Sequence, residues 1–529
     1  MFRGIGASDG IGIGKIIKIE DKEIKIPEKQ ITDVNAECQR FLDAVDVFVE
    51  KTMNMAEDMR KRVGEKEAEI LEGHAIMMQD PSIIDGVKEG IENGTCAEKA
   101  FVNVCDMFVN IFSMSDDELT KQRITDICDM QGRMLKILLG IEEVDITNVP
   151  ANTILAAVDL TPSMTVGINK ENVVGIITEV GGRTSHSAIL ARALGIPAVL
   201  SIKDVMSKIE NGKEVVVDGS EGIAILNPAE EVKTEYSKKR ESYYKEKEAL
   251  KQFIGKETET ADGHKVELVC NIGKPSDVDN VISFDGEGVG LFRTEFLFMD
   301  RNNAPSEEEQ FESYKSVCEK LSGKPVIIRT LDVGGDKEIP YLELEKEENP
   351  FLGYRAIRVC LDRKEMYRLQ LRALLRASAF GNIKIGVMIE TSAAVLIADI
   401  LAKEADFFSI GTNDLTQYTM VVDRGNAKVA YLYSTYNPAV LRAIKYVIKS
   451  AKKENIMVGM CGEAAADELL IPLLLAYGLD EFSVSATSVL STRKTISMWS
   501  KEEADVLLDK VEQLVIEEEV KNCLKANIK

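Results

Sequence analysis

The stretch Gly181–Ala198 holds the first residues whose types suggest chemistry, because a histidine stands at a turn between two predicted elements. The apolar run Val173–Thr178 predicts a buried strand, and Ala188–Leu194 predicts a short helix. His186 falls at or just before the helix start, where free backbone N–H groups favour an anion. An imidazole in that place can accept a phosphoryl group, although a lone histidine is more often structural.

A second set of candidate residues follows predicted strands of the C-terminal half. Arginine is preferred for bidentate binding of phosphate and carboxylate groups. Two carboxylates that leave room for water and substrate oxygens are typical of Mg²⁺, and a thiol can donate a proton. Each residue taken singly is more often a salt-bridge partner or a buried thiol, but together at strand ends they indicate a site. The candidates are Arg293, Arg329, Arg355 and Arg424 for an anion, Glu390 and Asp414 for a metal, and Cys461 for a proton.

The elements that carry this second set alternate between strands and helices from Val266 to Ser497, which is typical of a parallel α/β barrel. Catalytic residues of such barrels lie at the carboxyl ends of the strands. The predicted strands are Glu267–Ile272, Gly288–Phe292, Val326–Asp332, Ile385–Ile389, Phe407–Ile410 and Val458–Cys461, with Gly353–Ile357 as a possible seventh.

The N-terminal half combines three patterns. Gly4–Glu20 contains Gly10, Gly12 and Gly14 at a spacing of two but continues as an alternating strand, so we expect a hairpin that joins the His186 domain rather than a dinucleotide loop. Thr32–Ile141 is helical and rich in methionine, which we expect to pack between helices, with a methionine surface for a partner as the alternative. His74 lies in this segment and is expected to pack or dock. Ala229–Lys256 predicts a solvated linker helix.

Composition limits the classes of partner and compartment. A chain of 529 residues is too long for one core, so several domains are expected. The net charge of -23 argues against nucleic acid and anionic membranes and suits a basic protein partner. Nine cysteines without regular spacing indicate neither a disulfide framework nor a zinc site. No signal peptide or membrane-spanning run is found, so a cytoplasmic location is expected.

The stretch around His186 resembles the phosphohistidine motif of the Enzyme I family, the phosphoenolpyruvate–protein phosphotransferases of the bacterial sugar phosphotransferase system. Barrel motifs of that family also stand here in order, among them Gly290–Phe296, Ile328–Lys337, Gly411–Gln417 and Gly459–Glu463. The resemblance runs from residue 1 to about Asn522. It implies a multidomain α/β protein, with a swivelling phosphohistidine domain that carries an inserted helical bundle and a C-terminal (β/α)₈-type barrel.

The resemblance also implies roles for single residues. His186 would receive phosphate from phosphoenolpyruvate and pass it to the phosphocarrier protein HPr. Cys461 would protonate the enolate to give pyruvate. Glu390 and Asp414 would hold Mg²⁺. The residues implied to contact substrate are Arg293, Arg329, Arg355, Asn413 and Arg424.

The resemblance further predicts the domain limits and the assembly. Residues 1–30 and 146–228 would form the phosphohistidine domain, and residues 31–145 the helical HPr-binding domain. Residues 229–260 would form the linker helix, and residues 261–529 the phosphoenolpyruvate-binding barrel, which also dimerises in the family. We therefore expect a homodimer that takes part in sugar transport.

One part of the family pattern is missing. Between Ala377–Asn382 and Ile385–Glu390 the family has a strand of the type Met-Phe-Pro-Met-Ile and a following helix. About one βα unit, roughly 30–40 residues on barrel averages, is therefore absent. Ser392 also stands where the family commonly has proline. An incomplete barrel must expose two strand edges or close with altered geometry. We therefore predict a gapped or distorted barrel between the fourth strand and the one that ends at Glu390, with phosphorylation by phosphoenolpyruvate weakened or lost.

Two alternatives remain open at this stage. Phosphoenolpyruvate synthase and pyruvate phosphate dikinase share the barrel and the histidine domain but add a large ATP-binding domain, for which the chain has no phosphate loop. The other alternative is a non-catalytic regulator that binds HPr through a damaged barrel. The missing unit favours the regulator, and the complete set of candidate residues argues against it.

Overall fold

The computed structural model describes residues 1–19, 26, 31–62, 65–113, 118–141, 149–160, 164, 168–182, 185–299, 301, 303–335, 339–380, 384–424, 426 and 428–529. The chain forms two compact units, Met1–Glu246 and Lys247–Lys529. The boundary falls inside α9 (Glu230–Leu250), where the sequence predicts a linker helix. Only Tyr236 of this helix is buried, which is the property expected of a solvated helix.

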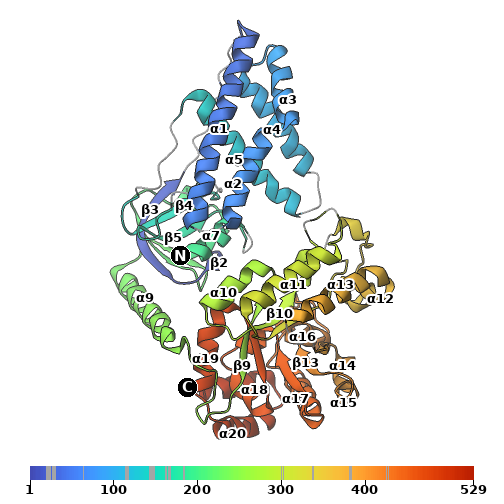
Figure 1. Cartoon of the computed structure of the whole chain (residues 1–529). Helices are drawn as coiled ribbons and strands as arrows, with labels where there is room; N and C mark the ends of the chain where they lie inside the picture. The colour runs from blue at the N-terminus through green and yellow to red at the C-terminus, as the bar shows by residue number, and fades with distance from the viewer. Residues whose placement is uncertain are drawn as a thin grey trace. The chain divides into compact units, whose positions relative to one another are not determined.

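A helical bundle makes up one part of the first unit (Figure 1). Its core contains Phe41, Phe48 and Phe101, which are fully buried. Among the methionines, Met78 lies in this core while Met53 is 45% exposed, so both packing and surface positions occur. The helices are α1 (Val34–Arg62), α2 (Glu65–Met78), α3 (Pro81–Glu92), α4 (Ala97–Ser113) and α5 (Glu118–Leu139).

The first unit also contains an eight-stranded sheet with the order β1-β8-β7-β3-β4-β5-β6-β2. The expected N-terminal hairpin is wrong, because β2 pairs with β6 and β3 pairs with β4 and β7 instead of with each other. The expectation that this segment joins the His186 sheet is confirmed. The strands are β1 (Phe2–Arg3), β2 (Ile5–Ser8), β3 (Ile11–Ile19), β4 (Thr153–Ala157), β5 (Val173–Thr178), β6 (Ala198–Leu200), β7 (Glu214–Asp218) and β8 (Ile223–Leu226), with helices α7 (His186–Leu194) and α8 (Val205–Lys208) between them.

A parallel seven-stranded sheet forms the centre of the second unit, in the order β11-β10-β9-β15-β14-β13-β12. Six strands lie where the sequence predicts them. The seventh prediction, Gly353–Ile357, is wrong, and the strand at Glu481–Val484 was missed. The strands are β9 (Glu267–Ile272), β10 (Val289–Arg293), β11 (Val326–Arg329), β12 (Gly386–Ile389), β13 (Phe407–Ile410), β14 (Met457–Met460) and β15 (Glu481–Val484).

Gly353–Ile357 differs from the prediction because its apolar residues are few and a helix begins at once. The segment follows a 3₁₀ turn at Pro350–Leu352 and leads into α12 at Ile357. Glu481–Val484 was missed because Asp480 and Glu481 open the strand with charge, although all four of its residues are buried.

Helices cover the outside of this parallel sheet, and they are coloured yellow to red in Figure 1. α17 shows why such helices dock: one apolar stripe of Val440, Ile444, Val447 and Ile448 is buried. Among the described residues, no helix has the length and hydropathy needed to cross a membrane. The helices are α10 (Val278–Ser283), α11 (Glu307–Leu321), α12 (Ile357–Asp362), α13 (Lys364–Ala377), α14 (Ser392–Leu396), α15 (Ala398–Leu401), α16 (Thr412–Met420), α17 (Pro438–Lys453), α18 (Ile471–Tyr477), α19 (Val489–Ser497), α20 (Lys501–Glu512) and α21 (Glu517–Ala526).

The sheet of the second unit is open between β11 and β12. These strands stand at its two ends, and no pairing joins them within the part of the chain that the structure describes. All four residues of β11 are only half-buried, and Gly386 of β12 is exposed. β13 and β15 are buried throughout. The predicted gap therefore lies where the sequence analysis places it, and it leaves two edges that no described residue pairs with.

Candidate active site

The backbone around His186 forms the start of a capped helix. His186 is the first residue of α7, two residues earlier than the predicted helix start. The Ser185 hydroxyl accepts a hydrogen bond from the Ala188 N–H and donates one to the Gly182 carbonyl. Gly195 ends the helix in the left-handed conformation with φ 68°. Capping fixes the turn that carries His186.

The environment of His186 is described in part. Ser187 is buried and its hydroxyl donates to Asp159 Oδ1 at 2.8 Å, which ties the first turn of α7 to the segment after β4. Arg183 and Thr184, which stand in the predicted motif, lie outside the described residues, and so does the side chain of His186. The helix start therefore has the form required for an anion site, and the role of His186 stays a prediction.

In the second unit, the carboxyl ends of β10 and β11 bring an ionic cluster together. Arg329 ends β11, and its guanidinium pairs with Glu295 and, at 3.2 Å, with Asp332. Arg355 lies 3.1 Å from the other oxygen of Asp332. Arg293 stands directly opposite Arg329 in the strand register and is exposed. Parallel pairing places these strand ends at one edge, which gathers the predicted arginines.

Glu390 and Asp414 lie in the same electrostatic neighbourhood. The pKa of Glu390 is raised to about 7, mainly by burial and also by the nearby Asp414 and Asp332, while Arg329 and Arg355 oppose the rise. Groups influence a pKa in this way only when they are close. The structure therefore brings the two predicted metal ligands and two predicted substrate arginines together at the carboxyl ends of the strands.

Asn413 and Arg424 complete the set on the other side of Asp414. The Asn413 side-chain oxygen accepts a hydrogen bond from the Glu463 N–H at 3.0 Å, which holds the Asn413 side chain against the segment that follows β14. Arg424 pairs with Asp414 at 3.3 Å. Its backbone N–H donates to Gln417 in α16. These contacts place Asn413, Asp414 and Arg424 beside one another.

Cys461 follows β14 directly and is 9% exposed. Its thiol lies 3.8 Å from the Ile410 carbonyl, which can accept a weak hydrogen bond. Burial raises the pKa of the Cys461 thiol to about 11, and the nearby Arg329 charge partly opposes this. The thiol therefore keeps its proton at neutral pH, as a proton donor must.

The carboxylates fit a magnesium ion on two observations. Asp414 Oδ1 is buried, and it forms an ion pair with Arg424 at 3.3 Å without accepting a hydrogen bond from the described residues. Gly411 leaves space for the other carboxylate, because a Cβ there would come within 2.8 Å of Glu390 Oε2. The described residues contain no group of three or more metal-ligating side chains. Mg²⁺ commonly binds two protein carboxylates and completes its coordination with oxygens of substrate and water.

Glu295 and Asp332 stand within the motifs Gly290–Phe296 and Ile328–Lys337, but the sequence analysis assigns them no role. Both pair with Arg329, and Asp332 also pairs with Arg355. The available signal was their position two and three residues from predicted arginines, since acidic residues orient guanidinium groups that must bind anions. We infer that they position the arginines.

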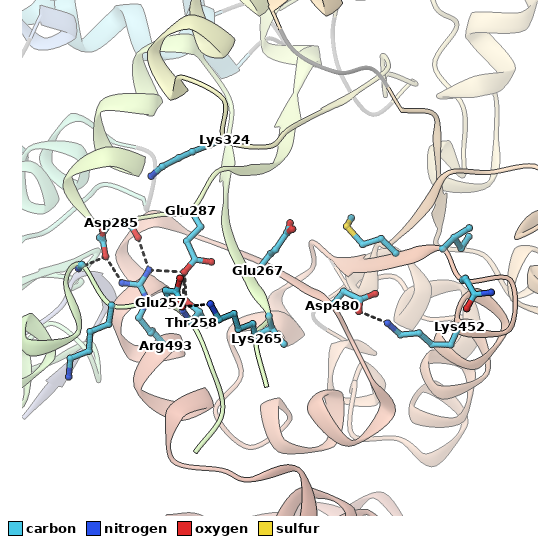
Figure 2. Close-up of a pocket in the computed structure, with 16 residues that line it drawn as sticks. Glu257, Thr258, Lys265, Glu267, Asp285, Glu287, Lys324, Lys452, Asp480 and Arg493 are labelled. Atoms are coloured by element: carbon cyan, nitrogen blue, oxygen red, sulfur yellow. Dashed lines mark hydrogen bonds and ion pairs between the residues drawn. The ribbon is translucent and has the colours of Figure 1, made fainter. Parts of the chain in front are cut away.

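A cavity of about 930 Å³ lies at the opposite, amino ends of the strands (Figure 2). Figure 2 shows that its charged side chains largely pair with one another. Arg493, which is almost fully buried, pairs with Asp285 and Glu287, and Lys452 pairs with Asp480. Their charges already neutralise one another, so this cavity is less suited to phosphate than the arginine cluster at the carboxyl ends.

His74 is buried inside the helical bundle and is 1% exposed. Its ring nitrogens lie 3.4 Å from Asp126 and 3.6 Å from Asp129, both in α5. Of the two roles expected for His74, the structure shows packing.

Comparison with known proteins identifies the family. A phosphoenolpyruvate–protein phosphotransferase of Priestia megaterium is 46% identical over 99% of this chain and 98% of its own length. The protein of the same name from Bacillus subtilis is 45% identical over all of both chains. The chain belongs to the phosphoenolpyruvate–protein phosphotransferases. This confirms the resemblance and the fold class, and it favours the phosphotransferase over both alternatives.

Family models match the separate parts of the chain. The N-terminal part of phosphoenolpyruvate-utilising enzymes matches residues 3–123, and their mobile domain matches residues 149–222, which include His186. The phosphoenolpyruvate-binding domain matches in two segments, 247–385 and 381–500. A solved Enzyme I structure matches over its whole length and 46% of this chain, with 37% identity and a TM-score of 0.41.

The comparisons also locate the missing unit. The alignment with the Bacillus subtilis relative spans 567 positions, 38 more than the 529 residues of this chain. The match to the phosphoenolpyruvate-binding domain breaks at residues 381–385, between β11 and β12. A βα unit of the predicted length is therefore absent at the place where the sheet is open.

Proposed function

We propose that this phosphoenolpyruvate–protein phosphotransferase uses His186 as its phosphoryl acceptor and HPr as its protein substrate, in the first step of sugar transport by the phosphotransferase system. The single observation that carries the chemistry is the strand-end cluster, in which two arginines, two carboxylates and a protonated thiol meet. A cytoplasmic location and a homodimer formed through the C-terminal unit belong to the same proposal.

Phosphoenolpyruvate would bind at the carboxyl ends of the strands. Arg293, Arg329, Arg355 and Arg424 supply positive charge for its phosphate and carboxylate groups, and Asn413 supplies an amide. Glu295 and Asp332 hold two of the guanidinium groups in place before substrate arrives. Fixed charges of this kind stabilise a transferring phosphoryl group without reorganisation.

Glu390 and Asp414 would hold Mg²⁺. The ion, when bound, supplies positive charge that stabilises the phosphoryl group during transfer. Because burial and Asp414 raise the pKa of Glu390 to about 7, this carboxyl must lose its proton when it becomes a ligand.

The transfer itself balances within this set of residues. A ring nitrogen of His186 forms a bond to phosphorus while the bond between phosphorus and the enol oxygen breaks. The electron pair stays on that oxygen and gives the enolate of pyruvate. Cys461 donates its proton to the terminal carbon, which completes pyruvate. Phosphohistidine then passes its phosphoryl group to HPr.

Incubation with ³²P-phosphoenolpyruvate, Mg²⁺ and HPr tests the proposal. Label should appear on HPr with the native chain and disappear with His186→Ala. His74→Ala serves as a matched control, because His74 is the buried histidine of the helical bundle and should leave labelling intact. Unchanged labelling of HPr with His186→Ala would refute the role of His186. A chain that binds HPr but never transfers label would support the regulator instead.

A further inference from the structure

In the part of the chain that the structure describes, the C-terminal sheet has an unpaired strand edge at each end of its strand order. β11 ends one side of the sheet and β12 the other, and all the pairs between them are parallel. Exposed backbone edges are templates for pairing with a further strand. One strand inserted here would pair with both edges and close the sheet.

Apolar side chains flank this opening on the helices before and after it. Leu371 and Leu375 of α13 are 37% and 60% exposed. Leu396 ends α14, Ile397 stands between α14 and α15, and Ile400 lies in α15; they are 76%, 43% and 57% exposed. We call these five residues the gap strip. In a βα barrel each helix packs against its neighbours, so a helix that followed an inserted strand would lie between α13 and α14 and cover the gap strip.

A buried charge inside the sheet indicates the chemistry of the missing strand. Glu481 opens β15 and is 1% exposed, yet neither of its carboxylate oxygens has a hydrogen-bond partner among the described residues. Its register neighbour on β9 is Glu267, which lines the cavity of Figure 2 and is influenced by Glu287, Asp480 and Lys384. A buried carboxyl without a partner stays protonated, whereas a cationic partner would allow it to ionise in place.

The barrel geometry connects Glu481 with the opening. In an eight-stranded parallel barrel, alternate strands contribute side chains to the same interior layer. Counted from β9, the absent strand is the fourth and β15 is the eighth, so both belong to the same alternate set. A lysine or arginine near the amino end of an inserted strand would therefore point into the layer that contains Glu481.

A second copy of this chain is a poor candidate for the occupant. Each of the strands β9–β15 is already paired within its own sheet, so none is free to be donated. The relatives carry 38 further aligned positions, and the family match breaks between β11 and β12. The opening therefore has the size of one βα unit.

We propose that the open side of the C-terminal sheet binds, in trans, one βα segment of another polypeptide. Its strand carries a basic residue near the amino end, and its helix presents an apolar face to the gap strip. The binding closes the barrel between β11 and β12 and gives Glu481 a cationic partner. It requires no phosphoenolpyruvate and is independent of the function proposed for His186.

The probe is a fluorescent synthetic peptide with the sequence that the Bacillus subtilis relative has opposite the break at residues 381–385. Two versions differ at the first inward-facing position of the strand, which is lysine in one and methionine in the other. Anisotropy should show saturable one-to-one binding of the lysine version. Thermal unfolding monitored by Trp499, the only tryptophan of the chain, should move to higher temperature.

Substitutions separate the two parts of the proposal. Leu375→Glu and Leu396→Glu should each weaken binding at least tenfold, because each places a charge under the apolar face of the added helix. Val515→Glu is the matched control, since Val515 is 71% exposed outside the gap strip and should bind normally. Glu481→Gln should remove the preference for the lysine version over the methionine version.

The absence of binding at micromolar peptide would overturn the proposal. So would equal binding of the peptide to the Val515→Glu and Leu375→Glu chains, or equal affinity of both peptide versions for the native chain. Sedimentation of the native chain covers the remaining occupant. If the chain self-associates and Leu375→Glu abolishes that association, the gap strip is an interface between copies and the proposal is wrong.

Discussion

At the scale of single residues, the molecule holds several ionisable groups whose surroundings change their chemistry. Glu390 keeps an elevated pKa because it is half-buried beside two other carboxylates, and Cys461 keeps its proton because it is buried. Glu481 combines burial with the absence of a partner among the described residues. The first two lie at the carboxyl ends of the strands, where the chemistry is proposed, and the third lies at the amino ends.

Glu481 should make the stability of the C-terminal unit depend on pH. Burial raises its pKa to about 8, and Glu267 and Asp480 add to the rise, whereas the unfolded carboxyl has its ordinary value of 4.5. The folded state therefore keeps a proton that the unfolded state loses. Stability falls as pH rises from about 4.5, and the loss is complete above about 8.

Glu481→Gln should remove this loss. At pH 9 the variant should be more stable than the native chain by on the order of 5 kcal/mol, and the two should converge near pH 4. Urea unfolding monitored by Trp499 measures the difference, because that residue is buried in the C-terminal unit. Glu518→Gln, on the exposed side of α21, is the control and should follow the native curve. Parallel curves for the native and Glu481→Gln chains would contradict the expectation.

Cys461→Ala should slow the formation of pyruvate by about 10²-fold or more, because a positioned proton donor is lost. Phosphoryl exchange between phosphorylated HPr and His186 forms no enolate and should keep its rate. Coupled pyruvate release and ³²P exchange measure the two steps. Cys318→Ala, on α11, should change neither. Equal slowing of both steps would assign Cys461 a structural role.

At the scale of elements, caps and register decide where the candidate side chains stand. Ser185 caps α7 and fixes the turn that precedes His186. Register pairs the last residue of β10 with the last residue of β11, so Arg293 and Arg329 stand together. β11 and β12 form strands although the family's strand between them is absent, because each still pairs with its other neighbour in the sheet.

Ser185→Ala should loosen the first turn of α7. Loss of an N-cap hydroxyl costs about 1 kcal/mol, which corresponds to roughly fivefold faster opening of the helix start. Hydrogen exchange of the α7 amides measures this change. Ser500→Ala removes the equivalent cap of α20 and should speed exchange there without affecting α7. Unchanged exchange in α7 would show that tertiary contacts, such as the Ser187–Asp159 hydrogen bond, already hold the turn.

At the scale of the whole molecule, the missing unit affects only one of the two compact units. The sheet that carries α7 has eight paired strands and needs nothing from the C-terminal unit for its own pairing. Glu390 stands directly after β12, the strand at the edge of the opening. The missing unit should therefore disturb the positions of the metal-binding and substrate-binding residues more than any other part of the chain.

The two half-reactions should respond differently to this loss. Phosphoryl exchange between phosphorylated HPr and His186 should proceed at the rate of the Bacillus subtilis relative. Phosphorylation of His186 by phosphoenolpyruvate should be slower by tenfold or more, since displacement of about 1 Å at a reacting site can cost a factor of about 10². Labelling each half-reaction separately measures both. Equal rates in this chain and the relative for both steps would contradict the prediction.

Much of the molecule was determined by the sequence itself. Local periodicity identified six of the seven C-terminal strands, because a buried strand is apolar along its own length. Residues that follow a parallel strand must gather at one edge, so Arg329, Glu390 and Cys461 could be predicted as candidate site residues without coordinates. The family segment that is absent between Asn382 and Ile385 gave the position of the missing unit. Only the tertiary structure decided which carboxylate holds which arginine, how burial changes Glu390, and that Glu481 lies inside the sheet with no partner among the described residues. Those properties depend on residues brought close by folding from distant parts of the chain, and local pattern carries no information about such distances.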